Sequence, residues 1–219
     1  GMFITPPGTA AVIFIGALQQ GIKGMAGGYM LTPGILDAYN GSIAALREQG
    51  VQSLGTAAPA AKQATPHLLQ VTAAQAQENP AVCHEVFGPS SLHLNTGSIE
   101  ELYGLARGLE GQLTVTIHGT EEDLQQHAAL IDILREKAGR IIINGFPTGV
   151  AVNHAMVHGG PWPATTPAAG TSVGTMAIYR FCRPVCFQDF PPYLLPPELQ
   201  DINPMGIWRL VNGDFTRDA

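Results

Sequence analysis

Residues 98–144 read SIEELYGLARGLEGQLTVTIHGTEEDLQQHAALIDILREKAGRIIIN, and the order of elements in this stretch decides the fold class. A helix predicted from Ser98 precedes the β-branched strand Leu113–His118. A single second helix, predicted over about residues 120–138, precedes the continuous apolar strand Arg140–Asn144. Both helices start with the pattern of a capping box. Continuous apolar strands that alternate with helices predict an α/β fold with a parallel sheet flanked by helices.

Two more helices and two more strands are predicted upstream of this stretch. Thr9–Lys23 is apolar throughout and is therefore expected to be a buried helix. A second helix is expected over Pro33–Gln49, with Thr32 as its N-cap. Leu68–Thr72 and Ser90–Leu94 read as short strands. We expect them to share one parallel sheet with the two downstream strands.

Downstream, the composition changes. Gly145–Gly174 is rich in Gly, Pro and Thr and shows no period, which is typical of a functional loop. Thr175–Phe187 reads as a strand, and Pro184 indicates that it lies at an edge. The sequence thus predicts one domain over residues 2–174 and a strand with an extended tail over residues 175–219.

Composition excludes several classes of protein. Hydrophobic residues make up 45% and charged residues 13% of the 219 residues, which argues against disorder. The net charge is -6 and no segment concentrates Lys and Arg, so neither a nucleic acid nor a membrane is an expected partner. The apolar stretch Ala10–Leu18 is too short to span a bilayer. Three cysteines suggest no disulfide framework, and a cytoplasmic location is expected.

Generic chemical motifs are mostly absent from the sequence. It contains no G-x-G-x-x-G after a strand, no phosphate-binding P-loop and no G-x-S-x-G elbow. His154 and His158 have the spacing of two zinc ligands, but no third ligand is evident, so we interpret them as loop histidines and expect no metal. We interpret Cys182 and Cys186 as small buried hydrophobic residues.

Glu85–Pro89 reads EVFGP, a carboxylate and an aromatic residue followed by a rigid turn. Alone, it fits a surface Glu beside a core Phe equally well. Three further segments accompany it: RIIINGFPTG (140–149), the longer stretch that begins HAMVHGG (154–199), and GIWRLVNG (206–213). With them, the chain from about Phe3 to its end resembles the aldehyde dehydrogenases, most closely the branch that oxidises 2-oxoglutarate semialdehyde.

The resemblance implies a catalytic-domain fold and a set of site residues. It implies that Glu85 holds a ribose of NAD or NADP and that Phe87 packs beside the nicotinamide. It also implies that the loop with Phe146, Pro147 and His158 helps to form the substrate pocket. The family's nucleotide-binding domain precedes this region and is absent from the sequence, so we expect the chain alone to bind the cofactor very weakly.

The family's nucleophile is a cysteine in an F-C-T-x-P-G motif, and the matching segment here is Phe3–Gly8, FITPPG. Ile4 occupies the cysteine position and cannot act as a nucleophile. Thr5 follows it, but a hydroxyl needs a paired base, and none is apparent in the sequence. The chain is therefore expected to be an inactive fragment of an NAD(P)-dependent aldehyde dehydrogenase. The alternative is a non-catalytic remnant with only an assembly or binding role.

The resemblance also implies self-association. Family members dimerise through a strand near the C-terminus, and Thr175–Phe187 resembles that strand. An unpaired edge invites pairing, so a homo-oligomer, at least a dimer, is expected. The alternative is that this strand folds back on its own domain. A separate chain that supplies the nucleotide-binding half is a further candidate partner.

Overall fold

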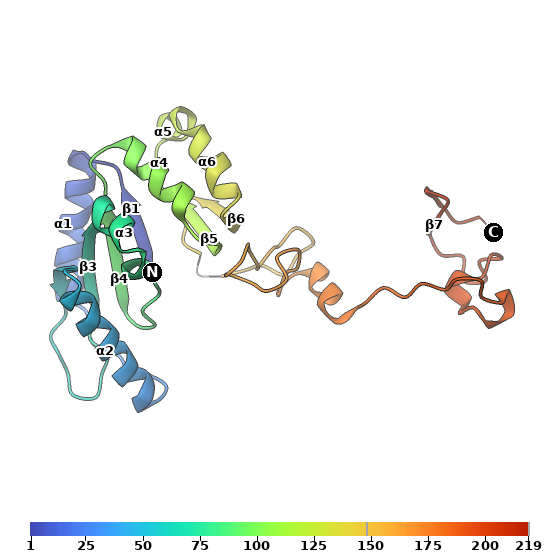
Figure 1. Cartoon of the computed structure of the whole chain (residues 1–219), viewed down its shortest axis with the longest axis horizontal. Helices are drawn as coiled ribbons and strands as arrows, with labels where there is room; N and C mark the ends of the chain where they lie inside the picture. Colours follow the sequence, from blue (N-terminus) through green and yellow to red (C-terminus); the bar gives the residue numbers. More distant parts are fainter. Residues whose placement is uncertain (148, 219) are drawn as a thin grey trace. The chain divides into compact units, whose positions relative to one another are not determined.

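The computed structural model describes residues 1–147 and 149–218. These residues form two compact units, Gly1–Met176 and Ala177–Ala219 (Figure 1). None of the helices in the described part of the chain is long and apolar enough to cross a lipid bilayer.

The first unit contains a four-stranded sheet, formed by β1 (Met2–Thr5), β2 (Gln52–Thr56), β3 (His67–Thr72) and β4 (Ser90–Asn95). The strand order is β1-β4-β3-β2, and Figure 1 labels the first three of these strands. β1, β4 and β3 are parallel, and β2 joins β3 antiparallel at the edge. The parallel pairing expected for β3 and β4 is confirmed, since Leu68 lies opposite Ser91.

The strands β5 (Gln112–Ile117) and β6 (Ala138–Ile143) form a second, two-stranded sheet. They are parallel, as expected, with Thr114 opposite Arg140. The expectation of one sheet containing all four predicted strands is wrong, because β1 and β5 are both end strands and no ladder joins them among the described residues. The chain is thus an α/β protein whose parallel strands are divided between two sheets.

Six helices accompany the sheets in the described part of the chain: α1 (Thr9–Lys23), α2 (Pro33–Glu48), α3 (Ala73–Glu78), α4 (Ile99–Gly108), α5 (Glu121–Gln126) and α6 (Ala128–Arg135). The capping box at Thr120 is confirmed. The one expected at Ser98 is only half formed, because the Glu101 carboxylate accepts from the Gly97 amide instead. The single helix expected over residues 120–138 is divided at His127, whose backbone leaves the helical region.

The hydrophobic core lies on one face of the four-stranded sheet. Strand alternation directs Leu69 and Val71 of β3 and Leu92 and Leu94 of β4 to that face. α2 packs against them, and its residue Tyr39 is only 1% exposed. The core is therefore built on the parallel pair β3–β4 and on α2, and Ala76 and Val82, which follow β3 in the chain, also belong to it.

α1 does not share that core. Its predicted boundaries are confirmed, but the expectation that it is buried is wrong, because none of its residues is buried. One side contacts β2, where Gln19 Nε2 donates to the Leu54 carbonyl at 3.1 Å. Nothing in the described part of the chain covers the other side, so apolar composition alone did not ensure burial.

The expected strand over Thr175–Phe187 is also wrong. Thr175–Phe181 forms the 3-10 helix η2, and the residues after it up to Phe187 have no regular structure. A strand needs a neighbour, and no strand pairs with this segment among the described residues. Three further 3-10 helices are η1 (Pro80–Cys83), η3 (Pro192–Leu194) and η4 (Pro197–Leu199).

The second unit contains a hairpin that was not predicted, formed by β7 (Arg209–Val211) and β8 (Asp214–Thr216). Asn212 and Gly213 connect the strands and both have positive φ, 51° and 95°. An Asn-Gly pair between short apolar runs is a strong hairpin signal, so the sequence did contain the information.

Candidate functional site

The position that matches the family's cysteine lies in β1. Ile4 pairs with Leu94 of β4, and its half-buried side chain packs against the hydrophobic core, as does that of Met2. Strand alternation therefore directs position 4 into the protein interior. The surroundings of Ile4 are apolar, and a thiol there would be disfavoured as a thiolate.

Thr5 lies on the opposite face of β1 and does have a paired base. Its hydroxyl is 2.8 Å from Nε2 of His93, and Nδ1 of His93 is 2.9 Å from Oε1 of Gln70. The expectation that Thr5 has no paired base is therefore wrong. Sequence reasoning missed His93 because a single histidine inside an apolar strand gives no signal of its partner.

The Thr5–His93 end of this network is buried, and Gln70 at its other end is partly exposed. Thr5 is 8% and His93 2% exposed, and the Phe3 ring stacks on the His93 ring with centroids 5.0 Å apart. Burial lowers the pKa of His93, so its ring is neutral near pH 7. Because a substrate has no described path to Thr5, these hydrogen bonds join β1, β4 and β3 rather than activate a nucleophile.

The EVFGP turn is fixed by Tyr39 of α2. A Cβ on Gly88, whose φ is +157°, would overlap the Tyr39 ring. The Tyr39 hydroxyl donates to the carbonyls of Thr65 and Pro89, at 2.7 and 3.3 Å. Burial raises the pKa of Tyr39 to about 12, so the hydroxyl keeps its proton. A motif read as a cofactor contact therefore also has a packing role, and its glycine is required by the neighbouring ring.

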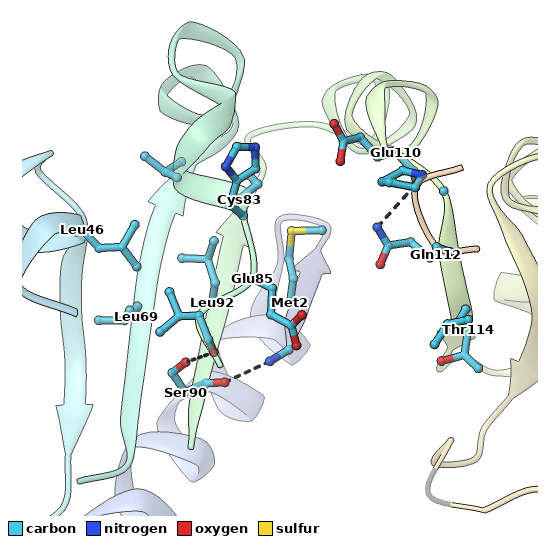
Figure 2. Close-up of a pocket in the computed structure, with 18 residues that line it drawn as sticks. Met2, Leu46, Leu69, Cys83, Glu85, Ser90, Leu92, Glu110, Gln112 and Thr114 are labelled. Carbon is cyan, nitrogen blue, oxygen red and sulfur yellow. Dashed lines mark hydrogen bonds between the residues drawn. The ribbon is translucent and has the colours of Figure 1, made fainter. Parts of the chain in front are cut away.

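Glu85 lines a cavity of about 550 Å³ in the first unit. Figure 2 shows Glu85, Ser90 and Met2 on the side of the four-stranded sheet, facing Gln112 and Thr114 of β5. Apolar side chains of the core form another part of the wall. The polar and ionisable side chains in its lining are Cys83, His84, Glu85, Ser90, Glu110, Gln112 and Thr114.

The other sequence-predicted site residues do not line this cavity. Phe87 and Phe146 are 69% and 79% exposed. The Pro147 carbonyl accepts from Arg140 of β6 at 3.4 Å. The His158 amide donates to the Thr171 hydroxyl at 2.8 Å, which holds the loop together. The structure therefore does not gather Glu85 and the three loop residues into one pocket.

The glycines after His158 have a packing role. A Cβ on Gly139 of β6 would overlap the carbonyl of Gly159, and a Cβ on Gly160 would overlap the carbonyl of Gln112. The Gly111 amide donates to the Trp162 carbonyl at 3.2 Å. The backbone of this segment thus lies directly against the starts of β5 and β6, an approach that only glycine permits.

The histidine and cysteine candidates remain apart. His154 Nδ1 lies 3.0 Å from the Thr175 hydroxyl. The residues that the structure describes contain no cluster of three His, Cys, Asp or Glu side chains able to hold a metal ion. The expected burial of Cys182 and Cys186 is wrong, because both are exposed. They lie in a segment of exposed residues without regular structure.

No protein-family model matches the chain. The alpha-ketoglutaric semialdehyde dehydrogenase of Acinetobacter baylyi is 45% identical over 232 aligned residues, covering 100% of this chain and 44% of that protein. The chain is homologous to aldehyde dehydrogenases. Alpha-ketoglutaric semialdehyde dehydrogenase 2 of Azospirillum brasilense is 44% identical, with 97% of this chain and 42% of that protein covered.

The fold of the aldehyde dehydrogenases is present as well. The crystal structure of lactaldehyde dehydrogenase from Escherichia coli superposes with a TM-score of 0.63 at 18% identity. The match covers 82% of this chain and 38% of that structure. The chain therefore spans less than half the length of the aldehyde dehydrogenases that it resembles.

The residues present do not make a complete dinucleotide site of the aldehyde dehydrogenase kind. The cavity beside Glu85 contains a second carboxylate, Glu110, and no Lys or Arg side chain in its described lining. A pyrophosphate is normally held by Lys or Arg side chains or by a free helix N-terminus, and the described lining contains neither of these. Phe87 is largely exposed and does not line this cavity.

Proposed function

We propose that this chain is an aldehyde dehydrogenase domain that does not oxidise aldehydes by itself. The observation that carries the proposal is the position of Ile4, a side chain without a nucleophilic atom that packs against the core. The family chemistry requires a cysteine thiolate that attacks the aldehyde carbon. Thr5 does not replace it, because its hydroxyl is buried and hydrogen-bonded to His93.

We infer the ancestral reaction from the names of two relatives. Both are named as dehydrogenases of alpha-ketoglutaric semialdehyde, which is 2-oxoglutarate semialdehyde. In an intact enzyme of this kind, Glu85 and Phe87 would contact NAD or NADP. Phe146, Pro147 and His158 would border the substrate. In this chain alone, one carboxylate edge without a phosphate site supports only very weak cofactor binding.

The test is a dehydrogenase assay on the full chain. Purified protein is mixed with 2-oxoglutarate semialdehyde and either NAD or NADP, and reduction of the nicotinamide is followed by absorbance. We expect no turnover above the rate without protein. The intact Acinetobacter baylyi relative, assayed in parallel, shows that the substrate is competent. Turnover that survives further purification and scales with this chain would overturn the proposal.

We also propose that the chain self-associates through residues of the Ala177–Ala219 unit. Support comes from large apolar side chains that the unit leaves exposed, among them Phe181 at 87% and Tyr193 at 81%. Exposed apolar surface of this kind favours association. Association by strand pairing through Thr175–Phe187 is not expected, because that segment is not a strand.

A further inference from the structure

Two of the three cysteines lie four positions apart in a segment that is exposed throughout. Cys182 and Cys186 are both exposed, and so is every other residue of the segment 178–190. Residues 182–188 have no regular structure (Figure 1). The third cysteine, Cys83, is half-buried, and burial raises the pKa of its thiol. Because the thiolate is the reactive form of cysteine, an oxidant from solvent should reach the exposed pair before Cys83.

The segment can bend far enough to bring the two thiols together. A disulfide needs Cα atoms about 4.4–6.8 Å apart, whereas four extended residues span about 13–14 Å. Among the described residues, no backbone hydrogen bond holds residues 183–190 in their present course. Arg183–Cys186 reads RPVC, and proline in the second of four positions suits a type I turn. Such a turn would bring the Cα atoms of Arg183 and Cys186 within about 7 Å of each other, and Cys182 is the next residue.

Two thiols are all that this segment offers for chemistry between side chains. The part of the chain that the structure describes has no cluster of three His, Cys, Asp or Glu side chains, so no third metal ligand joins Cys182 and Cys186. A structural zinc site needs four ligands. A disulfide needs only two sulfur atoms, and it is therefore the reaction that this pair can complete without a further residue.

We propose that Cys182 and Cys186 form a reversible disulfide within one chain when a hydroperoxide oxidises them. One thiolate attacks a peroxide oxygen, the O–O bond breaks, and the cysteine becomes a sulfenic acid while an alcohol or water leaves. The second thiolate attacks that sulfur, the S–S bond forms, and the sulfenic hydroxyl leaves as water. The two thiols lose two electrons to the peroxide, and their protons end on the released oxygens. The inference goes beyond the proposed function, because it involves neither an aldehyde nor a nicotinamide.

The test treats the full, folded chain with hydrogen peroxide and measures its intact mass and peptide map. We expect the chain to lose two hydrogen atoms, with the link mapped to Cys182 and Cys186, and a dithiol reductant to reverse the change. The rate should not depend on protein concentration, because both thiols belong to one chain. The Cys83 thiol should stay available to alkylation after unfolding, since it is half-buried and its pKa is raised.

Three variants identify the partners of the bond. Cys182→Ser and Cys186→Ser should each gain oxygen instead of losing hydrogen, because the remaining sulfenic acid has no thiol beside it. Both substitutions lie in an exposed segment, so the fold should be unaffected. Cys83→Ala is the matched control and should form the disulfide as the wild type does. Separate oxidation of both thiols without a link would overturn the inference, and so would a disulfide that joins two chains or one that includes Cys83.

Discussion

At the scale of single residues, replacing Ile4 by the cysteine that the family has at this position should not restore dehydrogenase activity. Ile4→Cys places a thiol among core side chains, where burial raises a thiol pKa and suppresses the reactive thiolate. We expect no dehydrogenase activity and a loss of about 1–2 kcal/mol of stability from the smaller side chain. Alkylation measured by mass spectrometry should be much slower at residue 4 than at exposed Cys182. Rapid modification at residue 4 would contradict this.

A second prediction at this scale concerns the stability of a variant at Gly88. Gly88→Ala places a methyl group into the Tyr39 ring at a backbone angle that suits glycine, so the free energy of unfolding should fall by about 2–3 kcal/mol. Chemical denaturation measures the change. Gly104→Ala in α4 is the control, because a Cβ there meets nothing within 4 Å and helix propensity improves. Similar effects of the two substitutions would refute the packing role of Tyr39.

At the scale of elements, the four-stranded sheet should weaken in acid. Burial lowers the pKa of His93 in the folded state, and burial followed by the charge of Arg47 lowers that of His67. Their contribution to stability is therefore complete above the unfolded pKa of about 6.5 and is lost as pH falls below it. Phe3, Thr5 and Gln70 surround His93 and carry no charge to offset its protonation.

Denaturant unfolding between pH 5 and pH 8, values that bracket the histidine pKa of about 6.5, measures this dependence. The slope should be positive, because both folded-state pKa values are lowered, and about 1.4 kcal/mol per pH unit for each histidine is its upper limit. His93→Gln should reduce it, at the cost of a lower stability at neutral pH. An unchanged slope in that variant would show that His93 does not couple protonation to folding.

The sequence predicted elements better than it predicted their surroundings. Short runs of apolar residues located β3 to β6, and the boundaries of α1 were predicted to the residue. β1 was missed because its four residues acquire strand character only by pairing with β4. The exposure of α1 and the partner of Thr5 depend on which segments meet in three dimensions, which periodicity does not specify. Glu85 was placed in a cavity only by the structure.

At the scale of the whole molecule, the proposed self-association predicts a mass in solution. At micromolar concentration, light scattering should give the mass of a dimer or a larger assembly of 23.1 kDa chains. Replacing Phe181 and Tyr193 by Asp should produce the monomer, because both side chains are exposed apolar groups of the Ala177–Ala219 unit. Val152→Asp, at a position 77% exposed in the first unit, should not. A wild-type mass of one chain would refute the proposal.

The position of β1 has a consequence for how the chain reaches its native state. Its hydrogen bonds join residues far apart in sequence: Thr5 and His93 are separated by 88 positions, and Thr5 and Thr96 by 91. Such contacts form slowly, because closing the long loop between the two residues costs conformational entropy. β3 and β4 can pair much earlier, so β1 should be the last strand to dock. Until it does, β4 is left with an open edge, and this is the interval in which the chain is most exposed to aggregation.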